Sequence, residues 1–263
     1  MEVSRLFNIE PIGVGTPYIE SLPSYIKRLA KAHFVFPGTL LAKEVYSEVY
    51  YYASKEYCLN SWSKSDLSFN FINGIIRILE NKTSNCNIRY LSLLKFGNKI
   101  YQKFHIRRYA AWCPICYEES KQFNCTIYEP LIWSIEDVSI CKKHNVKLHL
   151  VCPTCNSQIQ RYESELIIGY CPRCNTWLGS DQAEKGNEFS VLAYDQIGEI
   201  LCKLPSFDSS NEWEKMISES EIFRRFQLLK KINELISLQE EFTTDQVKTA
   251  SHIAFAKSRD ISV

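Results

Sequence analysis

The chain contains 263 residues, of which 45% are hydrophobic and 23% are charged, and its formal net charge is only +1. No apolar stretch approaches the roughly 18 residues that a membrane-spanning helix needs. The first residues, Met-Glu-Val-Ser-Arg, lack the basic and then apolar pattern of an export signal. We therefore expect a cytoplasmic protein without contact to a membrane, in which paired cysteines bind metal more often than they form disulfides.

The small net charge conceals an asymmetry along the chain. Residues 1–109 contain 15 Lys and Arg against 8 Asp and Glu, whereas residues 110–263 contain 16 against 22. A positive N-terminal part suits an acidic partner such as nucleic acid. Ordinary solvated helix faces would give the same excess of lysine, so both interpretations stay open.

The N-terminal elements begin with residues 1–19, which are rich in Pro and Gly and are predicted to be extended. A helix is predicted to begin near Ser21, which can cap it, with Pro23 in the first turn. After a Pro-Gly break, Thr39 can cap a second helix that runs to about Tyr52. Two short helices joined by a tight turn resemble a helix-turn-helix unit, which either reads DNA or only packs.

Three further segments complete the N-terminal part. Apolar residues at helical spacing predict a helix over residues 66–80, and the apolar stretch 90–96 is either a strand or a buried turn. Residues 100–112 mix aromatic and basic side chains, which can stack on bases and bind phosphates or can pack beside a metal site. We expect contacts with nucleic acid or a partner from six basic residues: Lys27, Arg28, Lys31, Lys103, Arg107 and Arg108.

Four pairs of potential metal ligands follow, each pair separated by two residues. They are Cys113 and Cys116, Cys141 and His144, Cys152 and Cys155, and Cys171 and Cys174. Two such pairs close a tetrahedral zinc site, so four pairs predict two zinc ions. Each site would be filled by four protein ligands, which is typical of structural rather than catalytic zinc.

The two sites differ in the strength of their patterns. The second matches a ribbon-type four-cysteine spacing, with segment 158–169 able to form a hairpin and with Asn156 and Asn175 tolerating the left-handed turn beside each knuckle. In the first site, Cys125 and His149 compete as ligands. We expect Cys125 to be a core residue, like the other scattered cysteines (Cys58, Cys86 and Cys202), and His149 to be exposed on a strand.

Enzymatic uses of these residues find little support in the sequence. The CxxC pairs lack a thioredoxin-like strand and helix, and no His-x-Glu precedes a Pro-Cys-x-x-Cys as zinc deaminases require. No phosphate-cradling GxxxxGK[ST] loop, His-Glu-x-x-His or Gly-x-Ser-x-Gly motif is present. We therefore expect a protein that is not an enzyme.

The C-terminal part is predicted to be helical. Helices are expected near residues 190–204, over the amphipathic segment 222–238, and from Thr243 or Thr244 to about residue 257. The predicted fold is mainly α with small zinc-ribbon β elements. It comprises a helix-turn-helix-like domain (1–109), a tandem zinc module (110–180) and a C-terminal helical bundle (181–263).

Several motifs, taken in order, resemble the TniQ family. Residues 20–30 (Glu-Ser-Leu-Pro-Ser-Tyr-Ile-Lys-Arg-Leu-Ala) are similar to its N-terminal motif, and Leu-Ser-Leu-Leu at 91–94 is similar to its apolar segment before the zinc region. Trp-Cys-Pro-Ile-Cys at 112–116 then precedes Trp133, the Cys-Lys-Lys-His pair and two CPxC pairs. The resemblance covers roughly residues 10–180. Lys143 and the run at 134–137 depart from the family pattern without affecting a ligand.

The resemblance implies a non-catalytic selector of transposition targets in a prokaryote. Such a protein links a target-recognition complex to an AAA+ ATPase regulator, which recruits the transposase. In CRISPR-associated transposons that complex is an effector with its guide RNA, whereas longer TnsD-type relatives read attachment-site DNA directly. The adaptor is the preferred expectation, with target DNA and a second copy as further partners. A direct DNA reader and a zinc-stabilised transcriptional regulator are the alternatives.

Overall fold

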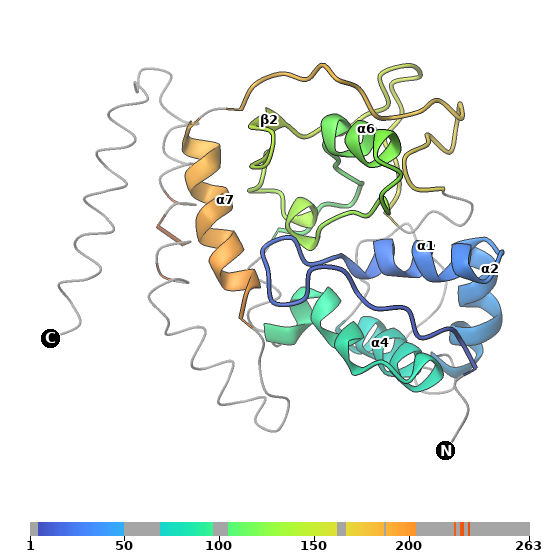
Figure 1. Ribbon diagram of the computed structural model, residues 1–263. Helices are drawn as coiled ribbons and strands as arrows, with labels where there is room; N and C mark the ends of the chain where they lie inside the picture. Colours follow the sequence, from blue (N-terminus) through green and yellow to red (C-terminus); the bar gives the residue numbers. More distant parts are fainter. Residues whose placement is uncertain are drawn as a thin grey trace, which may run out of the picture.

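The structure, a computed structural model, describes residues 5–49, 69–96, 105–161, 167–186 and 188–203, together with residues 224, 227, 228 and 231. Within these residues the protein is mainly helical and has one two-stranded sheet. Helices of the N-terminal part lie on one side of the molecule, and the cysteine-rich region lies on the other (Figure 1). The predicted fold class, helices with small β elements and metal-binding modules, is confirmed.

The first helix, α1 (Leu22–Ala32), begins as its sequence predicts. Ser21 is the N-cap, its side chain accepts a hydrogen bond from the Ser24 amide, and a proline occupies the first turn. Tyr25 and Leu29 are completely inaccessible to solvent. Burial of these side chains in the core holds α1 in place.

The second helix begins earlier than predicted. Helix α2 (Pro37–Leu41) has Phe36 as its N-cap, without a side-chain hydrogen bond, so Thr39 lies inside the helix and the cap predicted there is wrong. The physical reason is that Pro37 already has the backbone angle of a first helical residue. The chain continues through a wider π-helical turn, η1 (Ala42–Tyr46), and stays helical to residue 49.

The helix predicted over 66–80 is α4 (Phe69–Thr83). Two 3-10 helices follow it, η2 (Cys86–Leu91) and η3 (Leu93–Phe96). Leu91 and Phe96 are fully buried in them. The apolar stretch 90–96, for which the sequence allowed a strand or a buried turn, is therefore made of buried helical turns.

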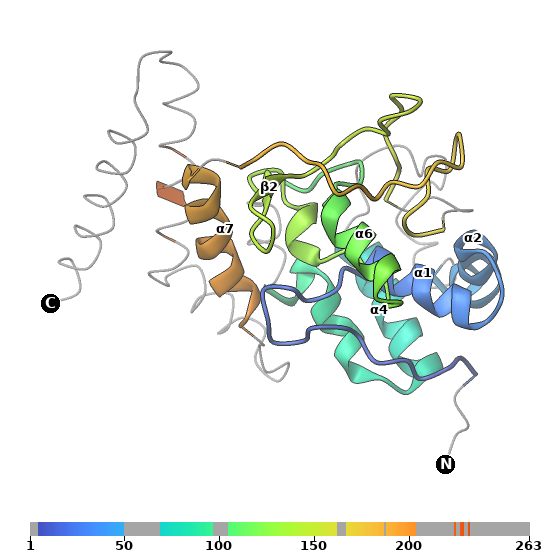
Figure 2. The same cartoon turned by 45° about the horizontal axis from the view of Figure 1, so that its top comes forward.

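The cysteine-rich region contains short elements joined by loops. Helix α6 (Pro114–Gln122) and the 3-10 helix η4 (Leu131–Ser134) precede strands β1 (Ile140–Cys141) and β2 (Val146–Lys147), which pair antiparallel. Helix α7 (Glu188–Leu201), the counterpart of the helix predicted near 190–204, packs on η4 and β1. Figure 2 shows α7 at the edge of this region, beside β2.

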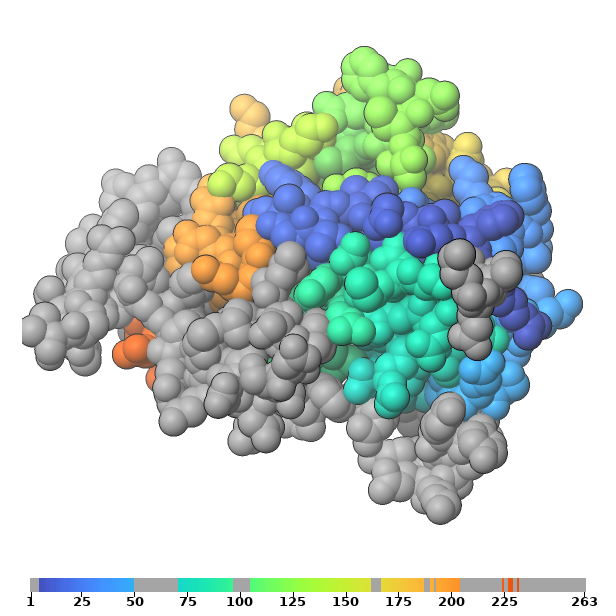
Figure 3. Space-filling view, turned by 60° about the horizontal axis from the view of Figure 1, so that its bottom comes forward, coloured from blue at the N-terminus to red at the C-terminus, as the bar shows by residue number. Residues whose placement is uncertain are grey.

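The N-terminal segment joins the two sides of the molecule. The Leu6 amide donates to the Lys82 carbonyl at 2.8 Å, and the Leu131 amide donates to the Ile19 carbonyl at 2.7 Å. Figure 3 shows this segment as a dark blue band between the teal and the green parts of the chain. One cluster of buried residues extends from Leu6 to Leu201. The N-terminal helices and the cysteine-rich region therefore share a core, and the three-domain division stays a prediction.

Some predictions lie outside the described residues. These are the centre of the hairpin (162–166), nearly all of the helix over 222–238, the last helix and hence the C-terminal bundle. Among the residues that are described, no helix combines the length and the apolar character that crossing a membrane requires.

Candidate metal centres

A helix start and a sheet turn assemble the first group of four predicted ligands. Cys113 is the N-cap of α6, and its sulfur accepts a hydrogen bond from the Cys116 amide. Cys141 ends β1, and His144 lies in the turn that leads to β2. Asn145 has a φ of 51°, the left-handed conformation that reverses the chain after His144.

The separations of these ligand atoms suit a tetrahedral ion. Nδ1 of His144 lies 3.4, 3.3 and 3.7 Å from the Sγ atoms of Cys113, Cys116 and Cys141, and the last two sulfurs are 3.6 Å apart. Zn–S bonds of about 2.3 Å and Zn–N bonds of about 2.0 Å place tetrahedral donors about 3.5 to 3.8 Å apart. The four residues therefore fit zinc as they stand.

The charges of the first cluster also favour a bound cation. Hydrogen bonds from Cys113 and Cys116 lower the pKa of the Cys141 thiol to about 2. Contacts with Cys113 and then Cys141 raise the pKa of Cys116 far above its usual range. The Cys141 thiol thus ionises easily while the Cys116 thiol stays protonated, because adjacent thiolates repel each other. A divalent cation offsets this repulsion and lets all three cysteines bind as thiolates.

Glu119 on α6 lies behind the histidine of this cluster. Its Oε1 is 3.0 Å from Nε2 of His144, whose Nδ1 faces the sulfurs. Hydrogen bonding from Lys143 lowers the pKa of Glu119, and His144 lowers it further. A carboxylate at the second nitrogen of a ligating histidine fixes the ring and strengthens the ligand. Sequence reasoning missed Glu119, because only the fold brings it to His144.

Two equivalent turns form the second cluster. The Asn156 amide donates to the Cys152 carbonyl at 2.9 Å, and the Asn175 amide donates to the Cys171 carbonyl at 2.8 Å. Asn156 and Asn175 have φ values of 55° and 56°. The left-handed turn predicted beside each knuckle is therefore confirmed.

The sulfurs of the second cluster have the same spacing as those of the first. Cys152 Sγ lies 3.6 Å from Cys174 Sγ, and Cys155 Sγ lies 3.7 Å from Cys171 Sγ. In each cluster all four ligand atoms lie within 4.8 Å of one another. Ser157 Oγ is 3.0 Å from Cys155 Sγ, and this hydrogen bond lowers the pKa of Cys155 to about 6. A lower pKa favours the thiolate, the form that binds metal.

Trp177 connects the second cluster to α6. Its Nε1 donates to Glu118 at 2.6 Å, and its ring lies 5.1 Å from the ring of Tyr170. A Cβ added at Gly169, where φ is 94°, or at Gly179 would lie 2.3 or 2.4 Å from the indole. These two glycines therefore let the indole approach the backbone and bridge the two metal centres.

Trp112 makes a second connection between the clusters. It is 1% exposed, and its Nε1 donates to the Leu178 carbonyl at 3.2 Å. Its backbone pairs in both directions with His149, whose ring lies 6.0 Å from the indole. His149 is half-buried, which lowers its pKa, so the expectation that it is exposed is wrong. Trp112 therefore packs inside the cysteine-rich region, which we call the metal region. Residues 100–104, the start of the aromatic and basic segment, lie outside the described residues.

The cysteines outside the clusters correct another expectation. Cys86 and Cys125 are exposed and Cys202 is half-buried, whereas Cys58 lies outside the described residues. The prediction of buried residues is therefore wrong for Cys86 and Cys125. Cys86 is the first residue of η2, and Cys125 lies in the loop just after α6 ends.

Two of the six basic residues expected to contact a partner form ion pairs within the fold. Lys27 is 4% exposed, and its Nζ lies 3.1 and 2.9 Å from the two carboxylate oxygens of Glu129. Arg28 donates to both oxygens of the fully buried Glu20, at 2.8 and 2.7 Å. The enclosure of Lys27 corrects the expectation that it contacts a partner, because its charge already neutralises a buried carboxylate.

The other basic residues differ in their surroundings. Lys31 and Arg108 are exposed, and the Arg108 guanidinium lies 5.4 Å from the centre of the Tyr109 ring. Arg107 is half-buried and donates to two backbone carbonyls, those of residues 136 and 138, at 2.9 and 2.8 Å. Lys103 lies outside the described residues. Lys31 and Arg108 thus keep charge at the surface, and their contacts stay predictions.

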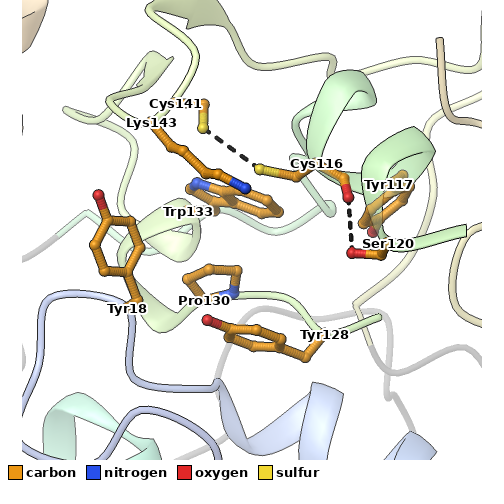
Figure 4. Close-up of a pocket in the computed structure, with 9 residues that line it drawn as sticks. All are labelled: Tyr18, Cys116, Tyr117, Ser120, Tyr128, Pro130, Trp133, Cys141 and Lys143. Carbon is orange, nitrogen blue, oxygen red and sulfur yellow. Dashed lines mark hydrogen bonds between the residues drawn. The ribbon is translucent and has the colours of Figure 1, made fainter. Parts of the chain in front are cut away.

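A pocket of about 120 Å³ opens beside the first cluster. Figure 4 shows the rings of Tyr18, Tyr128 and Trp133 around Pro130, with Cys116 and other residues of the metal region above them. Burial raises the pKa of Tyr128, so its hydroxyl stays neutral. The pocket forms where the N-terminal segment meets the metal region.

Comparison with known proteins matches the N-terminal helices and the first cluster to one family. A family model described as TniQ matches residues 11–148, slightly more than half of the chain. The matched residues include α1, α6 and all four ligands of the first cluster, but the match ends before the second cluster. No curated protein matches the chain.

Proposed function

This chain belongs to the TniQ family, whose members act in transposition together with partner proteins and DNA, and on that premise we propose that it is a non-catalytic selector of transposition targets. It links a target-recognition complex, an RNA-guided CRISPR effector, to an AAA+ ATPase regulator that recruits the transposase. It acts in the cytoplasm of a prokaryote. The family match over residues 11–148 is the observation that carries this proposal.

The proposed metal chemistry is structural. Each of the two clusters offers four ligand atoms, so a bound zinc ion has no position left for a substrate water. Cys113, Cys116, Cys141 and His144 would hold one ion, and Cys152, Cys155, Cys171 and Cys174 would hold the other. Zinc there would fix the loops of a region whose sheet has only two strands of two residues each.

The fold suits an adaptor because contacts from several parts of the chain hold the metal region in place. Trp112 and Trp177 connect the metal region internally, and residues 5–20 connect it to the N-terminal helices. A rigid surface loses little conformational entropy when a partner docks. The protein could therefore present separate surfaces to two partners and hold them at a fixed separation.

Reconstitution from purified components tests the proposal. The zinc-loaded chain would be immobilised and incubated with the ATPase regulator and the CRISPR effector encoded beside it, with and without target DNA. An unrelated AAA+ ATPase serves as the control. Retention of both partners supports the adaptor. Binding to one DNA sequence without an effector supports a direct attachment-site reader, and retention of neither partner nor DNA contradicts both functions.

A further inference from the structure

Large apolar side chains gather at the turn between α1 and α2. Phe34 is 96% exposed, Phe36 51% and Val35 39%. Phe7, 57% exposed, lies beside them through its ring, which stacks on His33 with 4.3 Å between ring centres. We call Phe7, Phe34, Val35 and Phe36 the phenylalanine turn. Single exposed apolar residues are common, but a contiguous group of them is typical of an interaction site.

Phe34 occupies a backbone position that is unfavourable for its side chain. The Phe34 amide donates to the Lys31 carbonyl and the Val35 amide donates to the Ala30 carbonyl, both at 3.0 Å, so α1 ends in a Schellman motif. Phe34 is the residue just past the helix end, with a φ of 55°. Glycine is usual there, and asparagine occurs, because a bulky residue strains this conformation.

Elsewhere the chain follows the common rule for such positions. Among the described residues, the other non-glycine residues with positive φ are Ser84, Asn124, Asn145, Asn156 and Asn175. Phe34 is the bulky exception within that set. Its ring recovers little of the backbone cost through burial in this chain, since it is almost completely exposed.

Phe36, two residues later, also occupies a position that favours another type of residue. It is the N-cap of α2 but makes no side-chain cap bond, whereas Ser21 and Cys113 cap α1 and α6 through their side chains. A Ser or Asp at this position would stabilise a helix start better than an apolar residue. Two neighbouring special positions thus carry exposed phenylalanines at the expense of local stability. Such local exceptions are expected at functional sites.

We propose that the phenylalanine turn is a docking surface for a protein partner that presents an apolar pocket bordered by carboxylates. This inference rests on the proposed function, within which the partner is the AAA+ ATPase regulator. Phe34 is the central anchor, because it is the most exposed of the four residues. Rigid aromatic anchors that fill a pocket contribute most of the affinity in many protein interfaces.

The charges and the rings of the turn together favour a protein partner over a nucleic acid. Lys31, three residues before Phe34, and Lys43, on the helical segment that follows Phe36, are exposed, and the described residues provide no ion pair for either. These cations favour carboxylates on the partner. Glu44 and Glu48 lie on the same helical segment, and Glu48 is about half exposed. Arg5 and Lys82 pair with these two carboxylates, so the unpaired charge beside the turn is positive. The rings of the turn need an apolar pocket to fill, which a phosphate backbone does not supply, so an acidic protein surface fits better than a nucleic-acid duplex.

The test replaces each phenylalanine between α1 and α2 with a residue that suits its backbone position better. Phe34→Asn suits the left-handed position, and Phe36→Ser adds a helix cap. Phe123→Asn is the matched control, because Phe123 is 73% exposed and lies at the C-terminal end of α6. Binding of each purified, zinc-loaded full-length variant to the purified ATPase regulator would be measured by biolayer interferometry, beside thermal unfolding, sedimentation and anisotropy with a DNA duplex.

The expected result is that Phe34→Asn and Phe36→Ser weaken ATPase binding by about tenfold or more with an unchanged or raised melting temperature, while Phe123→Asn binds like the wild type. If the wild type binds the regulator and Phe34→Asn binds equally well, the docking surface is wrong but the adaptor stands. If the wild type does not bind the regulator, the proposed function fails first. A loss of self-association or of DNA binding, with ATPase binding unchanged, would assign the turn to a second copy or to nucleic acid and overturn the proposal.

Discussion

Lys27 on α1 and Glu129, which precedes η4, form an ion pair inside the protein, with Nζ 2.9 Å from Oε2. The two side chains are only 3% and 11% exposed. The Tyr117 hydroxyl also donates to Glu129, at 3.2 Å. The pair therefore connects the N-terminal helices to the metal region through a carboxylate that has little access to water.

Breaking this pair should destabilise the whole fold. Lys27→Met removes the cation and leaves Glu129 buried, which should lower the free energy of unfolding by about 3 kcal/mol or more. The control is Lys147→Met, because Lys147 pairs with Glu184 at the surface and such pairs contribute less than about 1 kcal/mol. Urea denaturation measures both. Equal losses in the two variants would show that the buried pair has no special role.

Features that depend on neighbouring residues could be predicted from the sequence, whereas features that depend on tertiary packing could not. The Ser21 cap and the left-handed asparagines could be predicted, since each depends on a few neighbouring residues. The ligand pairs could be predicted because a two-residue spacing suits one small ion. The pairing of Lys27 with Glu129 could not, because it joins residues 102 positions apart. An amphipathic-helix pattern cannot distinguish a buried, neutralised lysine from a solvated one.

Loss of one ligand should destabilise the protein more at the first centre than at the second. The wild type should contain two zinc ions per chain, measured by mass spectrometry of the metal. Cys113→Ser should lose one ion and most of the cooperative unfolding transition, because Cys113 is fully buried in the shared core. Cys174→Ser should lose one ion with a smaller fall in melting temperature, since Cys174 is half-buried.

Cys125→Ser is the control for both cysteine variants, because Cys125 is exposed and lies outside the clusters. It should keep two ions and the wild-type melting temperature. Loss of an ion in this variant would mean that Cys125 is a ligand and that the ligand set is different.

Glu119 should tune the first centre without being a ligand. Glu119→Gln keeps the shape but weakens the hold on Nε2 of His144, so zinc affinity at the first centre should fall by about 10- to 100-fold. Competition with a chromophoric chelator resolves the two ions, and the second centre is the internal reference. Glu199→Gln, an exposed change on α7, is the matched control. Identical chelation curves for all three proteins would contradict a role for Glu119.

Lys95 should make stability depend on pH in the alkaline range. Burial lowers the pKa of its ammonium from 10.5 to about 7, and Nζ donates to the Leu201 carbonyl at the end of α7, at 2.8 Å. Between pH 7 and 10 the unfolded chain holds this proton more tightly than the folded protein does, so this group makes folding more favourable as the pH rises. Below pH 7 both states are protonated, and the contribution becomes constant.

Lys95→Met removes this titration. The urea midpoint of the wild type should therefore increase relative to that of Lys95→Met as the pH is raised from 7 to 9. Other groups titrate in this range in both proteins, and comparing the two midpoints cancels them. Lys203→Met is a control at an exposed lysine next to the same helix end, and its pH profile should match the wild type. Parallel profiles for wild type and Lys95→Met would mean that Lys95 keeps an ordinary pKa in the folded protein, with its ammonium stabilised by the α7 carbonyls.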